Sequence, residues 1–248
     1  MSLTMLSIDT SAGTSVAILQ GAKVLAEVNV ASSMMHVESI GNAIAQALAL
    51  AGLAGKEIQA VVVGRGPAPF TGLRVGLAAG TVFAQAVEAQ LYGAVSLDAL
   101  AWSALQDAPL AAKVSARTPL LVTADARRSE VYWALYSGLS AEGLPLRSEL
   151  PAVNKPAVLE EHLVDRNLEV VRVGIPAENA LTDGADATRV PIATALGRVA
   201  QALLITDDLS HDTSPLYLRA PDAVLPKPHV RFGKAEYSKP VIAAEAAK

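Results

Sequence analysis

The fold of this chain is decided by the stretch Gly64-Arg65-Gly66-Pro67-Ala68-Pro69-Phe70-Thr71-Gly72-Leu73-Arg74-Val75-Gly76. It follows the apolar run 60–63, which predicts a buried strand, and it leads into 73–89, which predicts a helix. Glycines and prolines at such a joint make a rigid loop whose backbone amides are exposed beside the partial positive charge of the helix N-terminus. The loop therefore predicts either an anion-binding turn or a stiff, well-packed turn.

The residues of this loop that we expect to contribute to a site are Gly64, Gly66, Pro67, Phe70, Thr71, Gly72 and Arg74. The pattern is not that of a P-loop NTPase, because G-x-x-x-x-G-K-[ST] is absent. It is not a dinucleotide-binding fingerprint either, because Pro67 follows the first two glycines and Phe70 lies near the third glycine position.

Composition limits the function classes. The chain has 248 residues, of which 52% are hydrophobic and only 4% aromatic, so its core is built mainly from Ala, Val, Leu and Ile. The formal net charge of −4 argues against a free-standing nucleic-acid binder, which is more often basic. The absence of cysteine excludes disulfides, thiolate metal sites and cysteine nucleophiles, and it fits a cytosolic protein.

We also expect neither a membrane span nor a signal peptide. No apolar run reaches the ~18 residues that a transmembrane helix needs. The apolar N-terminal segment is only as long as a strand and runs directly into Asp9. The predicted location is therefore the cytoplasm, without membrane association.

The order of predicted elements is the same in the two halves of the chain. The first half predicts strands at 6–9, 15–19 and 24–30, a helix at 36–53, a strand at 60–63, a helix at 73–89, a strand at 91–95 and a helix at 97–106. The second half predicts strands at 119–124, 130–136 and 145–150, a helix at 157–164 capped by Asn154, a strand at 168–173 and a helix at 193–205. Asp9 to Gly64 spans 55 positions and Asp125 to Gly174 spans 49, so the two units also match in scale.

Three antiparallel strands, a helix, a parallel strand and a helix describe a ribonuclease-H-like unit. Two such units facing each other resemble the fold of actin, Hsp70 chaperones and sugar kinases, the ASKHA type. We therefore predict an α/β, duplicated ribonuclease-H-like, two-lobe fold. The expected divisions are a partner-binding lobe at 1–106, a second lobe at 107–225 and a flexible or strap-like tail at 226–248.

Five motifs in one order carry a more specific resemblance. They are Asp9-Thr10-Ser11, the loop ending at Gly76, Ser96-Leu97-Asp98-Ala99-Leu100, Asp125-Ala126-Arg127-Arg128-Ser129-Glu130-Val131-Tyr132 and Pro215-Leu216-Tyr217-Leu218-Arg219. Together they resemble the bacterial TsaB family, whose older name is YeaZ, over about residues 5–219. The resemblance implies a role in forming threonylcarbamoyladenosine (t6A) at position 37 of tRNAs that read codons starting with A.

The resemblance also implies a set of partners. In that pathway TsaB is a non-catalytic subunit that pairs with its paralogue TsaD, which transfers the threonylcarbamoyl group. TsaE joins as an ATPase, and TsaC-type enzymes supply the threonylcarbamoyl-adenylate. We expect a heterodimer with a TsaD-type protein, contact with a TsaE-type ATPase, a homodimer when the chain is alone, and tRNA contact only through the complex.

The expected nucleotide cleft is degenerate. Kinase-like members of this fold hold phosphate with one glycine-containing turn in each lobe. The first turn keeps its parts here, and the second does not, because arginines stand where glycines are expected. The cleft residues are Asp9, Thr10, Ser11, Gly13, Asp125, Arg127 and Arg128. We expect no tightly bound cofactor, weak ATP or ADP binding in the complex at most, and no catalytic residue. The two arginines either bind an anion or a partner's acid, or are solvated turn residues.

Metal and hydrolase sites are not expected. TsaD relatives carry a His-x-x-x-His pair where this chain has Ser96-Leu97-Asp98-Ala99-Leu100, and the four histidines are scattered. They are His36, His162, His211 and His229. There is no G-x-S-x-G elbow. Two other functions stay open: an active nucleotide-dependent kinase or hydrolase of the same fold, and a peptidase.

A partner surface is predicted on two helices. Gly72, Gly76 and Gly80 recur at i, i+4 and i+8, and residues 39–54 carry no charge. We expect an apolar patch that binds TsaD or a second copy, and that buries ~800 Å² per partner. Its predicted residues are Val37, Ile40, Ile44, Leu73, Gly76 and Gly80. The alternative is that the glycine stripe packs on the chain's own sheet.

Overall fold

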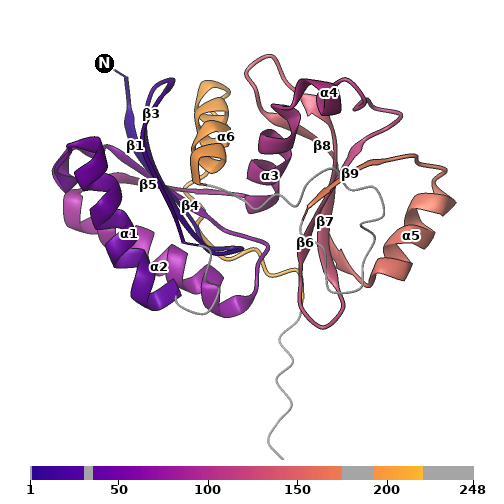
Figure 1. Cartoon of the computed structure of the whole chain (residues 1–248), viewed down its shortest axis with the longest axis horizontal. Helices are drawn as coiled ribbons and strands as arrows, with labels where there is room; N and C mark the ends of the chain where they lie inside the picture. Colours follow the sequence, from indigo (N-terminus) through magenta and orange to yellow (C-terminus); the bar gives the residue numbers. More distant parts are fainter. Residues whose placement is uncertain (1, 31–35, 175–192, 220–248) are drawn as a thin grey trace, which may run out of the picture.

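Two mixed β-sheets stand side by side, each covered by helices, in a computed structural model of the chain (Figure 1). The structure describes residues 2–30, 36–174 and 193–219, without the side chains of 36–38. The predicted tail at 226–248 and His229 lie outside the described residues. The two-lobe, actin-like fold is confirmed.

The first sheet has five strands in the order β3-β2-β1-β4-β5. Its strands are β1 Thr4–Asp9, β2 Thr14–Gln20, β3 Lys23–Val30, β4 Ala60–Gly64 and β5 Gln90–Ala94. Strand β2 pairs antiparallel with both β1 and β3, whereas β4 pairs in parallel with both β1 and β5. All residues of β1 and β4 are buried, because helices cover both faces of the sheet.

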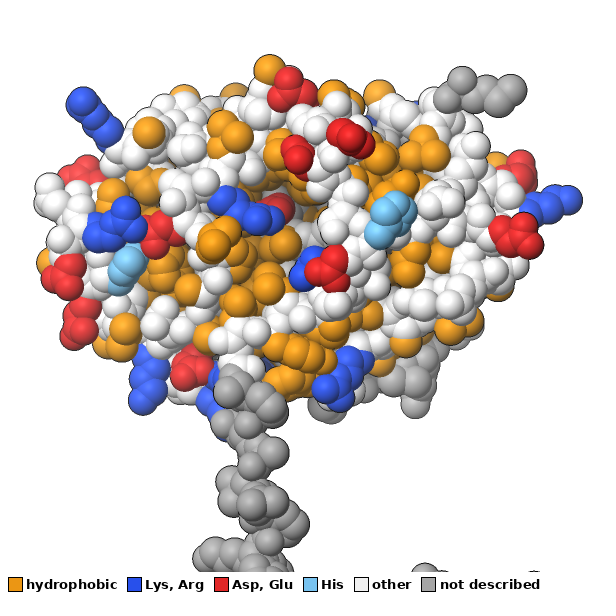
Figure 2. All heavy atoms as spheres, turned by 180° about the vertical axis from the view of Figure 1, so that it is seen from behind, with side chains coloured by type: hydrophobic (Ala, Val, Ile, Leu, Met, Phe, Trp, Pro, Cys, Tyr) orange, Lys and Arg blue, Asp and Glu red, His pale blue; other side chains and the backbone are white. Residues whose placement is uncertain are grey.

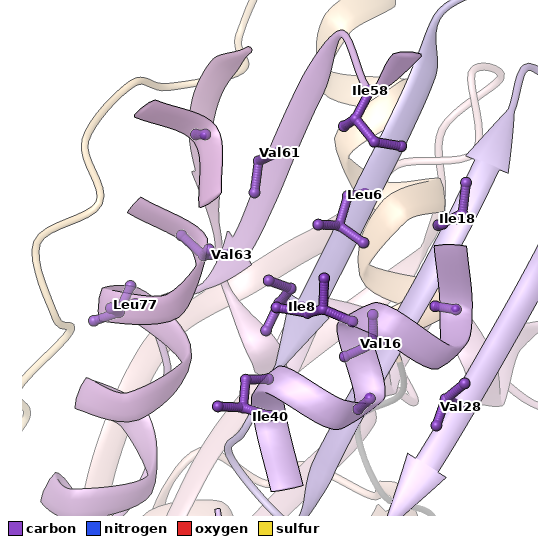
Figure 3. Packing of buried hydrophobic residues seen from close by; sticks show 14 of the residues in the cluster. Leu6, Ile8, Val16, Ile18, Val28, Ile40, Ile58, Val61, Val63 and Leu77 are labelled. Carbon is purple, nitrogen blue, oxygen red and sulfur yellow. The ribbon is translucent and has the colours of Figure 1, made fainter. Parts of the chain in front are cut away.

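One face of this sheet is covered by α1 (His36–Ala51) and α2 (Phe70–Val87), which lie side by side (Figure 1). Figure 3 shows aliphatic side chains from both layers meeting there. Leu6, Ile8 and Val63 of the sheet meet Ile40 and Leu77 of the helices. The short 3₁₀ helix η1 (Gly55–Glu57) follows α1.

The second sheet has four strands in the order β8-β7-β6-β9. Its strands are β6 Leu120–Asp125, β7 Val131–Leu139, β8 Pro145–Asn154 and β9 Val171–Gly174. Helix α5 (Pro156–Asp165) packs on one face, where Trp133 and Leu135 contact Leu159 and Leu163. On the other face lies α3 (Ser96–Leu105), followed by the short α4 (Ala108–Ala111), which the sequence did not predict.

Two helices lie between the sheets. Helix α6 (Ala193–Ile205) covers the second face of the first sheet, where Ala195 and Leu196 contact Met5 and Val62. Helix α3 faces the second sheet with Leu97 and Leu100, and its Ala99 packs against α6. In the described residues the chain thus reaches the second sheet with α3 and lies on the first sheet again at α6. The domain limits at 106 and 107 remain a prediction. Helix α3, from the first predicted segment, packs on the second sheet, and α6, from the second predicted segment, packs on the first sheet.

The sequence repeat is confirmed at its decisive positions. Strands β1 and β6 end at Asp9 and Asp125, and β4 and β9 end at Gly64 and Gly174. The predicted cap at Asn154 is wrong. The N-cap of α5 is Lys155, and the Asn154 side chain instead accepts a hydrogen bond of 2.8 Å from Trp133 Nε1.

Helix α2 is long and apolar enough to cross a membrane, although the sequence predicted no such segment. Its 18 residues contain Arg74 as their single charge, so by length and composition it is the one helix of the described residues that could cross a membrane. In this fold its buried face packs on the first sheet through Leu73 and Leu77. Such a helix is a core element of the lobe.

Candidate functional site

The carboxylate of Asp9 is enclosed by its own chain. Asp9 is only 1% exposed. Its Oδ1 accepts hydrogen bonds from the backbone N–H of Ser11 at 2.8 Å and from Ser11 Oγ at 2.5 Å. Its Oδ2 accepts from Ser96 Oγ at 2.7 Å. Burial raises the pKa of Asp9 above its ordinary value, although the Ser11 and Ser96 hydrogen bonds oppose this by stabilising the charged form.

Gly64 closes the remaining space around that carboxylate. A Cβ atom at Gly64 would lie 2.2 Å from Asp9 Oδ2 and 2.9 Å from Ser96 Oγ. The predicted first turn therefore forms, and Asp9, Ser11 and Gly64 do come together. Both carboxylate oxygens of Asp9, however, accept hydrogen bonds from hydroxyl and amide groups of the chain. On the side of Gly64 the carboxylate contacts backbone and not open space.

Helix α2 begins directly on this turn. Thr10 Oγ1 donates a 2.8 Å hydrogen bond to the Gly72 carbonyl oxygen. A Cβ at Gly76 would lie 2.3 Å from Thr10 Oγ1, and one at Gly80 would lie 2.2 Å from Val63 Cγ1. The glycine stripe therefore allows α2 to approach its own sheet.

This packing corrects the predicted partner residues. Ile40, Ile44, Leu73, Gly76 and Gly80 are all buried within the chain. The side chain of Val37 is outside the described residues. The helical periodicity correctly grouped these residues on one side of each helix. That side packs against the chain's own core, so the surface open to a partner is formed by other residues of α1 and α2.

The outward faces of α1 from residue 39 onward and of α2, whose side chains the structure describes, are nearly without charge. Apart from Phe70, which packs against Tyr217, the exposed positions are Gly41, Asn42, Ala45, Gln46, Ala49 and Leu50 on α1, and Thr71, Arg74, Ala78, Val82, Gln85 and Ala86 on α2. Arg74 is the single ionisable residue among these twelve, and Leu50 and Val82 are their large apolar side chains. We call this set of twelve residues the α1–α2 face.

The glycine-rich loop is a packed joint between elements. The backbone N–H of Arg65 donates to the Ala94 carbonyl at 2.9 Å, and that of Ser96 donates to the Gly66 carbonyl at 2.8 Å. The Gly66–Pro67 peptide bond is cis. From the other lobe, Tyr132 Oη lies 3.5 Å from the Ala68 carbonyl. These contacts favour the stiff-turn interpretation of the loop.

The second turn keeps its acid but not the open backbone of a phosphate-binding turn. Arg127, Arg128 and Ser129 all have positive φ, of 61°, 56° and 59°. Asp125 Oδ1 accepts from the Arg127 N–H at 2.7 Å, and Asp125 Oδ2 lies 3.4 Å from Arg127 Nη1. All three turn residues are exposed. Arg127 is thus paired with the acid of its own turn.

A segment that the sequence marked only as a motif joins the two lobes. Residues 210–219, which we call the strap, follow α6 and run along the first lobe. The Leu216 N–H donates to the Arg65 carbonyl at 2.7 Å, and Arg74 Nε donates to Tyr217 Oη at 2.8 Å. At the end of the strap, Arg219 pairs with Glu130 beside the second turn.

Metal ligands do not gather in the part of the chain that the structure describes, where no three His, Asp or Glu side chains come together. His162 Nε2 lies 2.9 Å from Glu149 Oε2, and His211 Nδ1 lies 2.8 Å from the Leu91 carbonyl oxygen. Asp98, at the place of the TsaD histidines, is paired with Arg147.

Known proteins of similar sequence identify the family. A protein of Mycobacterium tuberculosis described as uncharacterized is 35% identical over 202 residues, which cover 81% of this chain and 82% of that protein. The Escherichia coli protein named "tRNA threonylcarbamoyladenosine biosynthesis protein TsaB" is 31% identical over 139 residues, or 56% of this chain and 57% of that protein. The chain belongs to the TsaB (YeaZ) family.

Two further comparisons agree with TsaB membership. The family model for "TsaD: tRNA N6-adenosine threonylcarbamoyltransferase" matches residues 28–145, which fits a paralogue of TsaD. The solved structure of YeaZ from Pseudomonas aeruginosa superimposes with a TM-score of 0.67 at 23% identity, over 87% of this chain and all of that one. A second Pseudomonas aeruginosa structure, described as similar to peptidase YEAZ, gives a TM-score of 0.71 at 24% identity, over 88% of this chain and 100% of that one. At these identities the two structures establish the fold.

Proposed function

We propose that this chain is a non-catalytic subunit that pairs with a TsaD-type paralogue in forming t6A at position 37 of tRNA. Family membership and the name of the Escherichia coli relative support the pathway. The observation that carries the non-catalytic role is the enclosure of Asp9 by Ser11, Ser96 and Gly64. A kinase of this fold needs that acid open to a metal–nucleotide complex.

The second turn supports the same conclusion. Side chains at Arg127, Arg128 and Ser129 occupy the positions where a tightly held phosphate needs bare backbone. The residues therefore do not fit a tightly bound nucleotide in the chain alone. The proposal includes no resident cofactor, and ATP or ADP binding that is weak and confined to the complex.

The α1–α2 face supports the proposed interface. Among the described side chains of this helix pair, twelve outward positions carry a single charge, which is unusual for a solvated surface. Exposed alanines and Gly41 let a second helix approach closely. We propose that this face binds the TsaD-type partner and, in its absence, a second copy of the chain, with ~800 Å² buried on each side. The TsaE-type ATPase and tRNA are expected to join through the complex, in the cytoplasm.

The interface is tested by light scattering after size exclusion, on the chain alone and mixed with its own organism's TsaD-type protein. Val82→Arg places a charge on the α1–α2 face, at a side chain that is 65% exposed. We expect this variant to lose the one-to-one complex and the homodimer. Val164→Arg is the matched control, since Val164 is 74% exposed on α5 of the other lobe, and it should assemble as the wild type does.

A wild-type chain that forms no complex, even with the TsaE-type protein and nucleotide added, would contradict the proposed role. Loss of the complex in both valine variants would contradict the proposed location. The catalytic alternative is tested by ATP turnover of the isolated chain. We expect none above background, and turnover that depends on Asp9 would favour the kinase or hydrolase.

A further inference from the structure

A cavity of about 420 Å³ opens between the two sheets, away from the α1–α2 face. It is bounded by the end of β5, the first turn of α3, the start of β8 and the segment after α6. Figure 2 shows a hollow near the middle of this side of the molecule, with hydrophobic side chains inside it and charged side chains beside it. The volume lies within the range of small-molecule sites in proteins.

One wall of the cavity carries an arginine held in a single orientation. Arg147 Nε donates to Asp98 Oδ1 at 2.7 Å, and Arg147 Nη2 pairs with Asp98 Oδ2. Asp98 is almost fully buried, and its Oδ1 also accepts from Tyr136 Oη at 2.8 Å. This fork fixes the orientation of a guanidinium that lines the cavity and keeps 31% of its side chain exposed.

A second arginine lines the cavity from the first lobe. Arg65 Nη1 lies 2.6 Å from Asp212 Oδ2 and donates to the Asp212 carbonyl at 3.2 Å. Its Nε is buried and has no hydrogen-bond acceptor among the described residues. Because this N–H is enclosed by the chain, Arg65 contributes to the cavity through the other atoms of its side chain, which is 20% exposed.

The rest of the lining is largely apolar. Leu144, Leu146, Leu150 and Leu203 contribute to the walls, and Leu146 and Leu150 are among the large hydrophobic side chains that the fold leaves exposed. Two oriented arginines beside an apolar wall match a ligand with an anionic end and an apolar body. Arginine is suited to a carboxylate because its planar fork can donate two parallel hydrogen bonds.

We propose that this cavity binds a small organic carboxylate with an apolar body. The carboxylate is placed at Arg65 and Arg147, and the apolar body lies against the leucines. Asp98 and Asp212 hold the two arginines in place. Asp208 also lines the cavity, and its charge opposes any anion, so the ligand should carry a single anionic group placed at the arginines. This site does not depend on the proposed partnership, since no residue of the α1–α2 face lines it.

The test uses naphthalene-1-carboxylate and its neutral amide, naphthalene-1-carboxamide, titrated into the full chain by calorimetry. A ligand of this size is expected to bind with a Kd of about 0.1–1 mM. We expect the carboxylate to bind and the carboxamide to bind at least about tenfold more weakly, because charge-assisted hydrogen bonds to arginine are lost.

Variants at Leu150 then locate the site and its charge preference. Leu150 is 75% exposed, so substitution there should leave the fold intact. Leu150→Glu should weaken carboxylate binding about threefold or more, and Leu150→Lys should strengthen it by a similar factor. Val164→Glu and Val164→Lys, at an exposed site outside the cavity, should leave the affinity unchanged. Absence of binding, equal affinity for the amide, or equal effects of the two Leu150 variants would overturn the proposal.

Discussion

Gly64 lies against the carboxylate of Asp9, so closely that a Cβ atom there would be 2.2 Å from Oδ2. The two residues end the neighbouring parallel strands β4 and β1. Their contact explains why an acid at the end of the first strand can be almost fully buried. It also means that the first turn of the cleft cannot accept a larger residue at position 64 without displacing the acid.

Gly64→Ala is therefore expected to destabilise the fold. The added methyl group would meet a carboxylate that is held by three hydrogen bonds, and overpacking of this kind costs about 2–3 kcal/mol. The free energy of unfolding is measured by urea titration. Gly41→Ala is the control, because a methyl group at that position of α1 would have no atom within 4 Å, and it should be neutral or stabilising. Equal effects of the two substitutions would contradict the packing described.

Asp9 should make stability depend on pH. Its folded-state pKa is raised by burial above the ordinary 3.8, so the folded state keeps its proton at pH values where the unfolded state has released it. Stability from this group is complete below about pH 3.8 and is lost as the pH rises through the folded-state pKa.

Asp9→Asn removes this titration. The stability of the variant relative to the wild type should rise as the pH is raised from about 4, and then level off. Urea titrations of both proteins from about pH 4 to about pH 8 measure the difference, in which other groups cancel. A difference that is constant across this range would show that Asp9 has an ordinary pKa in the folded state.

Tyr136→Phe should lower the free energy of unfolding more than Tyr132→Phe does. Tyr136 Oη donates to the buried Asp98 carboxylate at 2.8 Å, and hydrogen bonds to charged groups contribute about 1.5–3 kcal/mol. Tyr132 Oη is 3.5 Å from its carbonyl acceptor, so Tyr132→Phe should cost below about 0.5 kcal/mol. Chemical denaturation of the two variants decides the point, and a reversed order would contradict the role of Tyr136.

Glu88→Gly should stabilise the chain. Glu88 ends α2 with φ 58° and ψ 31°, a left-handed conformation that glycine adopts without strain. Its charge is also unfavourable at a helix C-terminus. We expect a gain of about 0.5–1 kcal/mol, measured as a higher urea midpoint. Glu161→Gly, on an exposed position inside α5, should instead lose about 1 kcal/mol, and a loss in both variants would show that the left-handed cap carries no strain.

The repeated unit was predictable because its signals are local. Apolar runs that end in Asp9 and Asp125 marked β1 and β6, and glycines 64 and 174 marked the ends of the two parallel strands. Buried parallel strands have continuous apolar sequences, and glycine follows where the chain must turn closely. The family motifs lie at these same turns, so the same residues predicted both the fold and the family.

The partner face could not be predicted in the same way. The helical periodicity indicated which residues of α1 and α2 lie on the same side of each helix. The glycines at 76 and 80 indicated that another element packs closely against α2. Whether that approach is to a partner or to the chain's own sheet depends on where β1 and β4 lie, and the contacts with Thr10 and Val63 answer it.

The sequence by itself determined the two sheets, their strand order along the chain and the turns that carry Asp9, Asp125 and the arginines, because these follow from neighbouring residues. Tertiary structure alone decided that α6 covers the first sheet, that Asp9 is sealed by Gly64 and Ser96, and that Arg65 and Arg147 meet at one cavity. These are contacts between residues far apart in the chain. They depend on how packed layers fit in space, which no local pattern specifies.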